Sequence, residues 1–173
     1  MVKSHECRPF LNYNFYIEKM KRICFEIEEM IDSIRTISEQ LTNSNFDPEV
    51  IISVNRGGCV PGIYLSHYIN KPHEVINLEL RDSNKEPDLI SIYEKMKKFN
   101  SALIIDDIND SGKTIGVIKD LSKNLKTKIH FAVLINKSES KSKVEYYGKT
   151  VNTKVNDYWY VFPWENWWKL NEK

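Results

Sequence analysis

The sequence of 173 residues is poor in the features that mark several common protein classes. Its three cysteines, Cys7, Cys24 and Cys59, lie far apart and form no Cys-x-x-Cys pair, so we expect neither a zinc site nor a disulfide framework. The four histidines are scattered, and none lies near an obvious acid and nucleophile, which disfavours a catalytic triad. No apolar run approaches the ~20 residues that a membrane-spanning helix needs, and the N-terminus is too polar for a signal peptide. We therefore expect a cytoplasmic protein.

The sequence also lacks a strong net charge. Lys and Arg total 25 against 24 Asp and Glu, a formal net charge of +1, so the bulk charge favours neither nucleic acid nor an anionic membrane as a partner. Hydrophobic residues make up 41% of the chain, which is enough for the core of one globular domain. A group of lysines in the second half is interpreted as a solvated helix face and hairpin: Lys119, Lys123, Lys126, Lys128, Lys141 and Lys143.

Residues 103–116 carry the clearest functional pattern in the chain. The apolar run over residues 102–105 predicts a buried strand, and it ends in the paired acids Asp106 and Asp107. Sheets of α/β proteins bind ligands at this end of a strand, where paired carboxylates can accept hydrogen bonds from a diol or hold a divalent cation. A third acid, Asp110, follows at a position suited to the reacting end of the ligand.

A turn and a helical pattern follow these acids and predict a phosphate site. The first N–H groups of a helix have no internal partner, and Gly112 allows close approach, so this loop can wrap a phosphate. Its members are Asn109, Asp110, Ser111, Gly112, Lys113 and Thr114. Carboxylates beside a phosphate loop suggest a sugar phosphate, since hydroxyls or a metal must separate the like charges. A Walker A loop is excluded because its first glycine would fall at Asp107, and an EF-hand is excluded because Ile118 would have to be Glu.

A second sequence of strand, glycine turn and helix lies upstream. Residues 49–55 predict a short apolar strand that ends at Asn55 and is followed by Arg56, Gly57 and Gly58. Paired glycines let backbone amides approach an anion, which Arg56 can also neutralise. Taken alone, Arg-Gly-Gly is as typical of a tight turn as of a ligand loop; beside the first pattern it predicts a second phosphate site.

In this order and spacing, the two segments resemble the type I phosphoribosyltransferases. Residues 103–115 are similar to the family's signature for phosphoribosyl pyrophosphate (PRPP). The segment Arg56–Gly58 resembles the pyrophosphate loop of purine-specific members, with Asn55 in place of the usual serine. The resemblance implies that Asp106 and Asp107 bind the ribose hydroxyls and that the loop after them holds the 5′-phosphate. It also implies a cis peptide bond between Asn55 and Arg56.

The C-terminal segment holds all four tryptophans. Such a density of flat rings could be a core plug, a dimer contact or a stacking platform for a base. Residues 159–165, which read Trp-Tyr-Val-Phe-Pro-Trp-Glu, resemble the end of the xanthine- and hypoxanthine-guanine-type enzymes. The resemblance implies that Trp159 stacks on the purine and that Tyr160 and Val161 offer backbone groups to its edge. Trp164, Trp167 and Trp168 are then expected to serve packing.

The same resemblance implies further roles. Lys137 matches by position a lysine that donates to the exocyclic oxygen of a 6-oxopurine. The predicted catalytic residues are Asp110, which would take or relay the purine proton, and Arg56, which would help pyrophosphate to leave. The predicted cofactor is Mg²⁺, with Asp107 and Glu165 as its protein ligands.

The expected architecture is a three-layer α/β fold of the phosphoribosyltransferase type, with a central, mostly parallel sheet and a small hood, in one domain over residues 1–173. Its parts are an amphipathic N-terminal helix over 15–41, a PRPP-binding core over 49–135 and a C-terminal hood over 137–168. Residues 81–98 fit either a closing lid or an ordinary exposed loop with a short helix. A strand over residues 144–151 is expected to kink or turn at Gly148.

The resemblance implies a purine-salvage enzyme that transfers the 5-phosphoribosyl group from PRPP to guanine, xanthine or hypoxanthine. Its partners would be small molecules, namely PRPP, the base and the nucleoside monophosphate, and a second copy in a homodimer, with no nucleic acid or membrane. Two alternatives stay open. One is a regulator of the same fold that binds PRPP or a nucleotide without turnover, and the other is a phosphoribosyltransferase for adenine, orotate or uracil.

Overall fold

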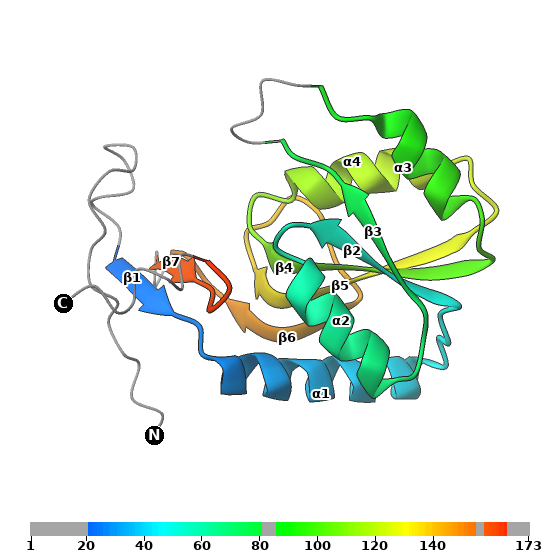
Figure 1. Cartoon of the computed structure of the whole chain (residues 1–173). Helices are drawn as coiled ribbons and strands as arrows, with labels where there is room; N and C mark the ends of the chain where they lie inside the picture. Colours follow the sequence, from blue (N-terminus) through cyan, green and yellow to red (C-terminus); the bar gives the residue numbers. More distant parts are fainter. Residues whose placement is uncertain (1–20, 81–85, 155–157, 166–173) are drawn as a thin grey trace.

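A five-stranded parallel sheet forms the centre of the protein in a computed structural model that describes residues 21–80, 86–154 and 158–165 (Figure 1). The strand order is β3-β2-β4-β5-β6, and every neighbouring pair is parallel. The strands are β2 (Val50–Asn55), β3 (His73–Asn77), β4 (Ser101–Asn109), β5 (Lys128–Lys137) and β6 (Tyr146–Val151). Because all strands run the same way, their carboxyl ends meet at one edge of the sheet.

Helices cover both faces of this sheet, which explains the continuous apolar runs in its central strands. On one face lie α1 (Ile27–Ser44) and α2 (Cys59–Tyr68), whose Ile37 and Leu65 pack against Leu103. On the other lie α3 (Leu89–Met96) and α4 (Lys113–Ser122), which pack against a second cluster that includes Ile104. The predicted three-layer α/β fold is confirmed (Figure 1).

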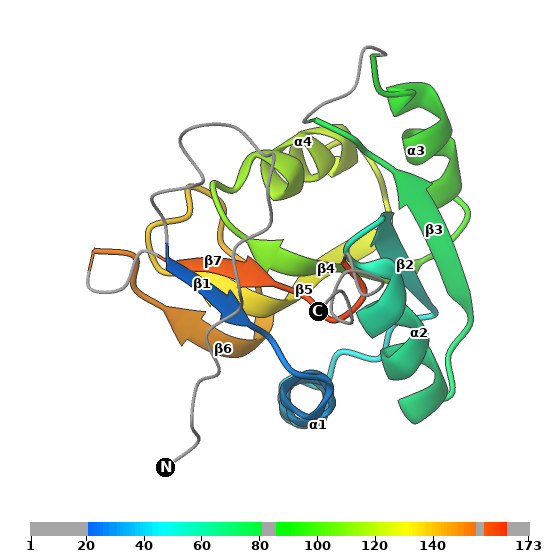
Figure 2. The same ribbon diagram turned by 60° about the vertical axis from the view of Figure 1, so that its left-hand side comes forward.

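A small second sheet lies beside the carboxyl-end edge and forms the hood. Its two strands, β1 (Lys21–Cys24) and β7 (Tyr158–Val161), run parallel and side by side (Figure 2). Arg22 pairs with Trp159 in this register. The hood therefore joins a segment near the N-terminus to one near the C-terminus.

The predicted helix over residues 15–41 is wrong in its bounds. Residues 21–24 form β1, α1 begins only at Ile27, and residues 15–20 lie outside the part that the structure describes. A capping box starts the helix: the Glu26 N–H donates to Glu29 Oε2 at 3.0 Å. Apolar spacing alone continues through the strand, so periodicity could not show this boundary.

Gly148 lies inside β6, so the strand does not turn there. A Cβ atom at Gly148 would lie 2.3 Å from Cβ of Ser33 in α1. The glycine thus lets the helix pack directly on the strand.

The cysteines depart from expectation at one position. Cys24 is disulfide-bonded, whereas Cys59 is a free thiol.

The second half of residues 81–98 is a helix that belongs to the core. Asp88 caps α3 by accepting a hydrogen bond from the Ser91 N–H at 2.9 Å, and Ile92 and Met96 are buried. Residues 81–85, the start of the stretch that fits either a lid or an ordinary loop, lie outside the described residues. Within the described chain, no helix is both long and apolar enough to span a membrane.

Candidate active site

The predicted pyrophosphate loop, Arg56–Gly58, follows β2 at the carboxyl edge of the sheet. The Asn55–Arg56 peptide bond is cis, as the resemblance implied. The Asn55 side chain is used within the protein: its Nδ2 donates to Asn77 Oδ1 at 2.8 Å, and its Oδ1 accepts from Cys59 Sγ at 3.3 Å. Asn55 therefore holds this loop between β3 and α2, so only its backbone is left for its predicted binding role.

Both glycines of this loop are needed for its close approach to β4. A Cβ atom on Gly57 would lie 2.2 Å from Asp107 Oδ2, and one on Gly58 would lie 2.3 Å from the carbonyl oxygen of Ile105. The loop thus packs directly against the paired acids at the end of the neighbouring strand. A ligand on this loop would consequently also meet Asp107.

Asp106 and Asp107 are half-buried at this edge, and burial opposes their charge. The Asp107 N–H donates to Asp106 Oδ1 at 2.9 Å. Burial raises the pKa of Asp106 to about 7. The pKa of Asp107 is raised well above its usual range, first by burial and then by the charges of Asp106 and Glu165. Such a pair is suited to hydroxyl donors or a cation that would compensate its charge.

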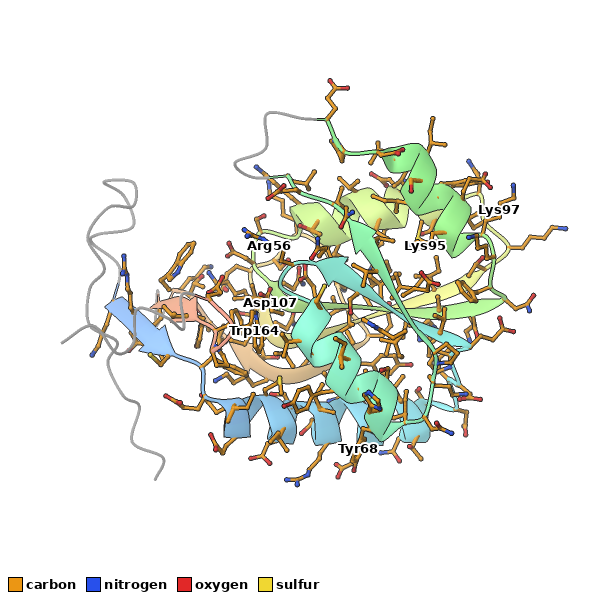
Figure 3. All side chains as sticks on the ribbon, viewed as in Figure 1. Arg56, Tyr68, Lys95, Lys97, Asp107 and Trp164 are labelled. Atoms are coloured by element: carbon orange, nitrogen blue, oxygen red, sulfur yellow. The ribbon has the colours of Figure 1, made fainter. Side chains whose placement is uncertain are left out.

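Glu165 and Arg56 complete this charged group. The pKa of Glu165 is raised by partial burial, although the Phe162 N–H, 3.2 Å from Oε2, and the Arg56 charge both act against the rise. Figure 3 shows Arg56 and Asp107 at the carboxyl-end edge of the sheet, with Trp164 on the hood side. The described residues contain no cluster of three or more His, Cys, Asp or Glu side chains that could hold a metal ion alone. Asp107 and Glu165 therefore suit a cation only if water or a substrate supplies further oxygens.

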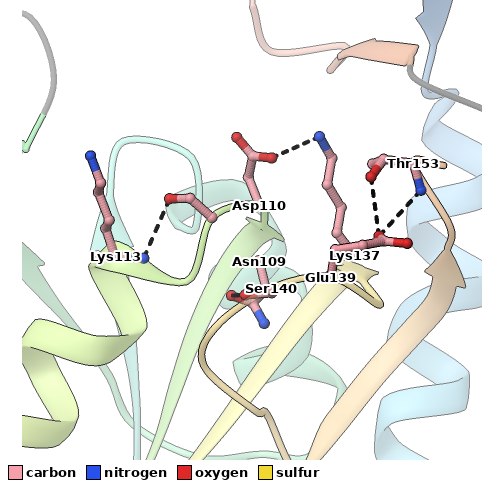
Figure 4. A network of polar contacts seen from close by, with 8 residues as sticks. Asn109, Asp110, Lys113, Lys137, Glu139, Ser140 and Thr153 are labelled. Atoms are coloured by element: carbon pink, nitrogen blue, oxygen red, sulfur yellow. Dashed lines mark hydrogen bonds and ion pairs between the residues drawn. The ribbon is translucent and has the colours of Figure 1, made fainter.

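The third acid meets the predicted base-binding lysine. Lys137 Nζ lies 2.7 Å from Asp110 Oδ1, with the lysine side chain 13% exposed and the aspartate 35% exposed (Figure 4). Asp110 directly follows β4 and Lys137 ends the neighbouring strand β5, and Asn109 pairs with Asn136 in the register. The structure thus brings together a donor and an acceptor that sequence analysis assigned to the same base.

The side chain of Asn109 bonds within the protein, which leaves only its backbone for the predicted phosphate role. The residue is 1% exposed. Its Nδ2 donates to Asn136 Oδ1 at 2.9 Å and to the Ser142 carbonyl at 2.7 Å, and its Oδ1 accepts from Ser140 Oγ at 2.8 Å. Every polar atom of the amide is thereby committed. Sequence analysis missed Ser140 and Ser142, which carry no motif of their own.

These serines support the predicted 5′-phosphate loop from behind. Gly112 has φ of 82°, and a Cβ atom there would lie 2.5 Å from the Ser142 nitrogen. Ser142 Oγ donates to the Gly112 carbonyl at 2.8 Å, and the Lys141 N–H donates to the Ser111 carbonyl at 3.4 Å. Only glycine adopts this left-handed conformation without strain and leaves room for the supporting segment. Helix α4 begins at Lys113, so Lys113 and Thr114 of the predicted loop lie in its first turn.

We predict that Asn109→Ala weakens PRPP binding about tenfold and lowers the free energy of unfolding by roughly 1–3 kcal/mol, because three partly buried groups lose their hydrogen bonds to Asn109. Isothermal titration with PRPP and urea unfolding measure the two effects. Asn100→Ala is the matched control, since its amide donates to Glu49 Oε1 at 2.8 Å next to the amino end of β4. Equal weakening of PRPP binding in both variants would contradict a supporting role for Asn109.

The hood places three predicted base-binding residues in one short strand. Trp159, Tyr160 and Val161 are all half-buried in β7. Trp164 serves packing, as expected, and stacks on Phe162 with ring centroids 5.0 Å apart. Its Nε1 is buried and has no hydrogen-bond partner among the described residues. Trp167 and Trp168 lie outside those residues.

Residues 24–168 match the family model of the phosphoribosyl transferase domain. The chain belongs to this family. It is 30% identical over 121 residues to a xanthine-guanine phosphoribosyltransferase of Desulfotalea psychrophila, covering 66% of this chain and 69% of that one. A second such enzyme, from Cereibacter sphaeroides, is 28% identical over 120 residues, covering 66% and 68% of the two chains.

Solved structures of phosphoribosyltransferases share the fold. A purine phosphoribosyltransferase from Pyrococcus horikoshii aligns with a TM-score of 0.65 and 27% identity, covering 84% of this chain and 95% of that one. A xanthine-guanine-hypoxanthine phosphoribosyltransferase from Helicobacter pylori aligns with a TM-score of 0.62 at 23% identity, covering 85% and 95%. Membership in the phosphoribosyl transferase family confirms the resemblance seen in the sequence and the predicted class of enzyme, a pentosyltransferase.

Proposed function

We propose that the protein transfers the 5-phosphoribosyl group of PRPP to a 6-oxopurine base and releases pyrophosphate. The observation that carries this proposal is the direct contact of the Arg56–Gly58 loop with Asp107 at the ends of neighbouring strands β2 and β4. PRPP has its diphosphate on C1 and hydroxyls on C2 and C3, so adjacent diphosphate and diol sites match it. Its 5′-phosphate would lie on residues 110–114, at the N-terminus of α4.

The base would lie under the hood, against Lys137 and Asp110. A 6-oxopurine carries a carbonyl oxygen that accepts a hydrogen bond from Lys137 and a ring N–H whose proton Asp110 can take. Adenine carries an exocyclic amino group at the same position, which would face a lysine with no acceptor. The ion pair at 2.7 Å therefore favours the oxo bases. Trp159 is proposed to stack on the base, with Tyr160 and Val161 at its edge.

The reaction then follows from these positions. The bond from ribose C1 to the pyrophosphate oxygen breaks while a bond to the purine nitrogen forms, and the purine proton passes to Asp110. Arg56 compensates negative charge on the leaving pyrophosphate, and the carboxylates of Asp106 and Asp107 stabilise positive charge on the ribose.

We include Mg²⁺ in this proposal because the acids at the site outnumber their cationic neighbours. The charge of Glu165 raises the pKa of Asp107, and the charge of Arg56 acts to lower the pKa of Glu165. These two carboxylates would hold the ion together with water and substrate oxygens. The ion would supply positive charge to the diphosphate.

We further propose a homodimer and a cytoplasmic location. Helix α2 exposes Ile63, Tyr64 and Tyr68 at 46%, 44% and 60%, an apolar face suited to a second copy. The proposed substrates are metabolites of the cytoplasm. Sedimentation of the wild type and of a Tyr64→Ser, Tyr68→Ser variant tests the dimer, which should dissociate when this face turns polar.

The test of the reaction is pyrophosphate release from PRPP with Mg²⁺, against guanine, xanthine, hypoxanthine, adenine, orotate and uracil. Turnover with a 6-oxopurine, abolished by a chelator, is the expected result and identifies the preferred base. Turnover with adenine, orotate or uracil alone would contradict the role of Lys137. No release with any base, despite measurable PRPP binding, would instead indicate a regulator of the same fold.

A further inference from the structure

One cation of the central sheet touches three other segments of the protein. Lys149 lies in β6, and its Nζ is 2.8 Å from Glu29 Oε1 in the first turn of α1. The same atom lies 4.8 Å from the ring centroid of Phe25 and 5.3 Å from that of Tyr160 in β7. Both distances suit a cation over an aromatic ring. A single ammonium group therefore joins the core to the hood.

The partners of Lys149 are themselves tied together. The other oxygen of Glu29, Oε2, accepts from the Glu26 N–H at 3.0 Å and so fixes the start of α1. Between that helix and β1, the Phe25 N–H donates to the Val161 carbonyl at 2.9 Å. The Phe25 ring is 1% exposed and lies 5.2 Å from that of Phe162. The segment that leads from α1 into the hood thus contacts Lys149 and β7 together.

The hood needs such a connection because the described residues give it a sheet of two strands. An isolated two-stranded sheet is at best marginally stable in water. Successive side chains of a strand point to opposite faces, so Trp159 and Val161 face away from the side on which Tyr160 lies. Since the Tyr160 ring contacts Lys149, holding that ring sets the direction in which Trp159 faces.

We propose that Lys149 is a positioning residue that fixes the hood strand β7 over the base site. This inference rests on the proposed function only in placing the base beneath β7. Lys149 contacts the hood through Tyr160 and the core through Glu29, so it acts on base binding through other residues. PRPP binding, which depends on the loops after β2 and β4, should not require it.

The test compares Lys149→Met, which keeps the chain length but removes the charge, with Lys149→Arg, which keeps a cation for both rings and for Glu29. We expect Lys149→Met to raise KM for the base about tenfold and to leave KM for PRPP within about twofold. Lys149→Arg should recover most of the base affinity. Lys97→Met is the matched control, since Lys97 lies 5.9 Å over the Tyr93 ring and pairs with Glu94 away from the hood.

Amide hydrogen exchange supplies a readout that needs no turnover. In Lys149→Met the amides of residues 158–161 should exchange at least about tenfold faster, while those of β2 and β4 stay as in the wild type. If Lys149→Met does not fold, Tyr160→Leu removes only the ring contact and should give the same pattern. The proposal would be overturned if the β7 amides of Lys149→Met exchanged no faster than those of Lys97→Met. It would also be overturned if Lys149→Met raised KM for the base and KM for PRPP equally. Absence of turnover in the wild type would instead refute the proposed function and leave the exchange result to decide the role of Lys149.

Discussion

Asp110→Asn is expected to lower kcat by about 10²- to 10⁴-fold while PRPP affinity changes by less than about threefold, the size of effect that loss of a general base produces. The asparagine keeps the shape of the side chain and can still accept a hydrogen bond from Lys137, but it cannot take a proton. The measurement is pyrophosphate release at saturating PRPP and base, together with calorimetric titration of PRPP alone.

The ion pair with Lys137 provides the internal control for this variant. Lys137→Met should mainly raise KM for the base, since the lysine is proposed to bind the oxo group, and the double variant shows how far the two effects depend on each other. Asp120→Asn, at an exposed pair with Lys123 in α4, should change nothing beyond twofold. If Asp110→Asn weakened PRPP binding as much as it slowed turnover, the role of base would have to be withdrawn.

The phosphate loops and the sheet could be predicted from the sequence because their signals are local. A buried parallel strand is apolar throughout, and residues 102–105 in β4 are all buried. The acids and the loop follow at fixed spacing, so the strand end brings them to the ligand edge without help from distant residues. The ion pair of Asp110 with Lys137 could also be predicted, since the resemblance assigned both residues to the purine base.

Features that depend on distant contacts could not be predicted. The commitment of Asn109 to Ser140 and Ser142 joins residues about thirty positions apart, and no motif marks the serines. β1 has only four residues and continues the apolar spacing of α1, so its pairing with β7 decides its structure. Lys149 and Glu29 lie 120 positions apart, and a single lysine in a strand carries no signal of its own. Each of these features depends on a contact between elements that are far apart in the sequence.

Asp106→Asn should weaken PRPP binding about 10- to 100-fold and, in the same protein, make the ligand-free fold more stable. The carboxyl is half-buried beside Asp107, so folding places its charge in an unfavourable position, which the ligand's hydroxyls would compensate. An asparagine can still accept the 2.9 Å hydrogen bond from the Asp107 N–H, yet it carries no charge. In a chelating buffer at pH 8, we expect the free energy of unfolding to rise by roughly 1–3 kcal/mol.

The pH dependence separates this effect from a general change in packing. Burial raises the pKa of Asp106 to about 7 in the folded protein, above its unfolded value near 4. Its contribution to stability is therefore fully present below pH 4 and is lost as the pH rises through 7. The advantage of Asp106→Asn over the wild type should consequently be larger at pH 8 than at pH 5 in urea unfolding, while Asp120→Asn shows no such trend. If Asp106→Asn were less stable than the wild type at pH 8, this carboxylate would support the fold. If the variant bound PRPP with unchanged affinity, the carboxylate would have no part in holding the ribose.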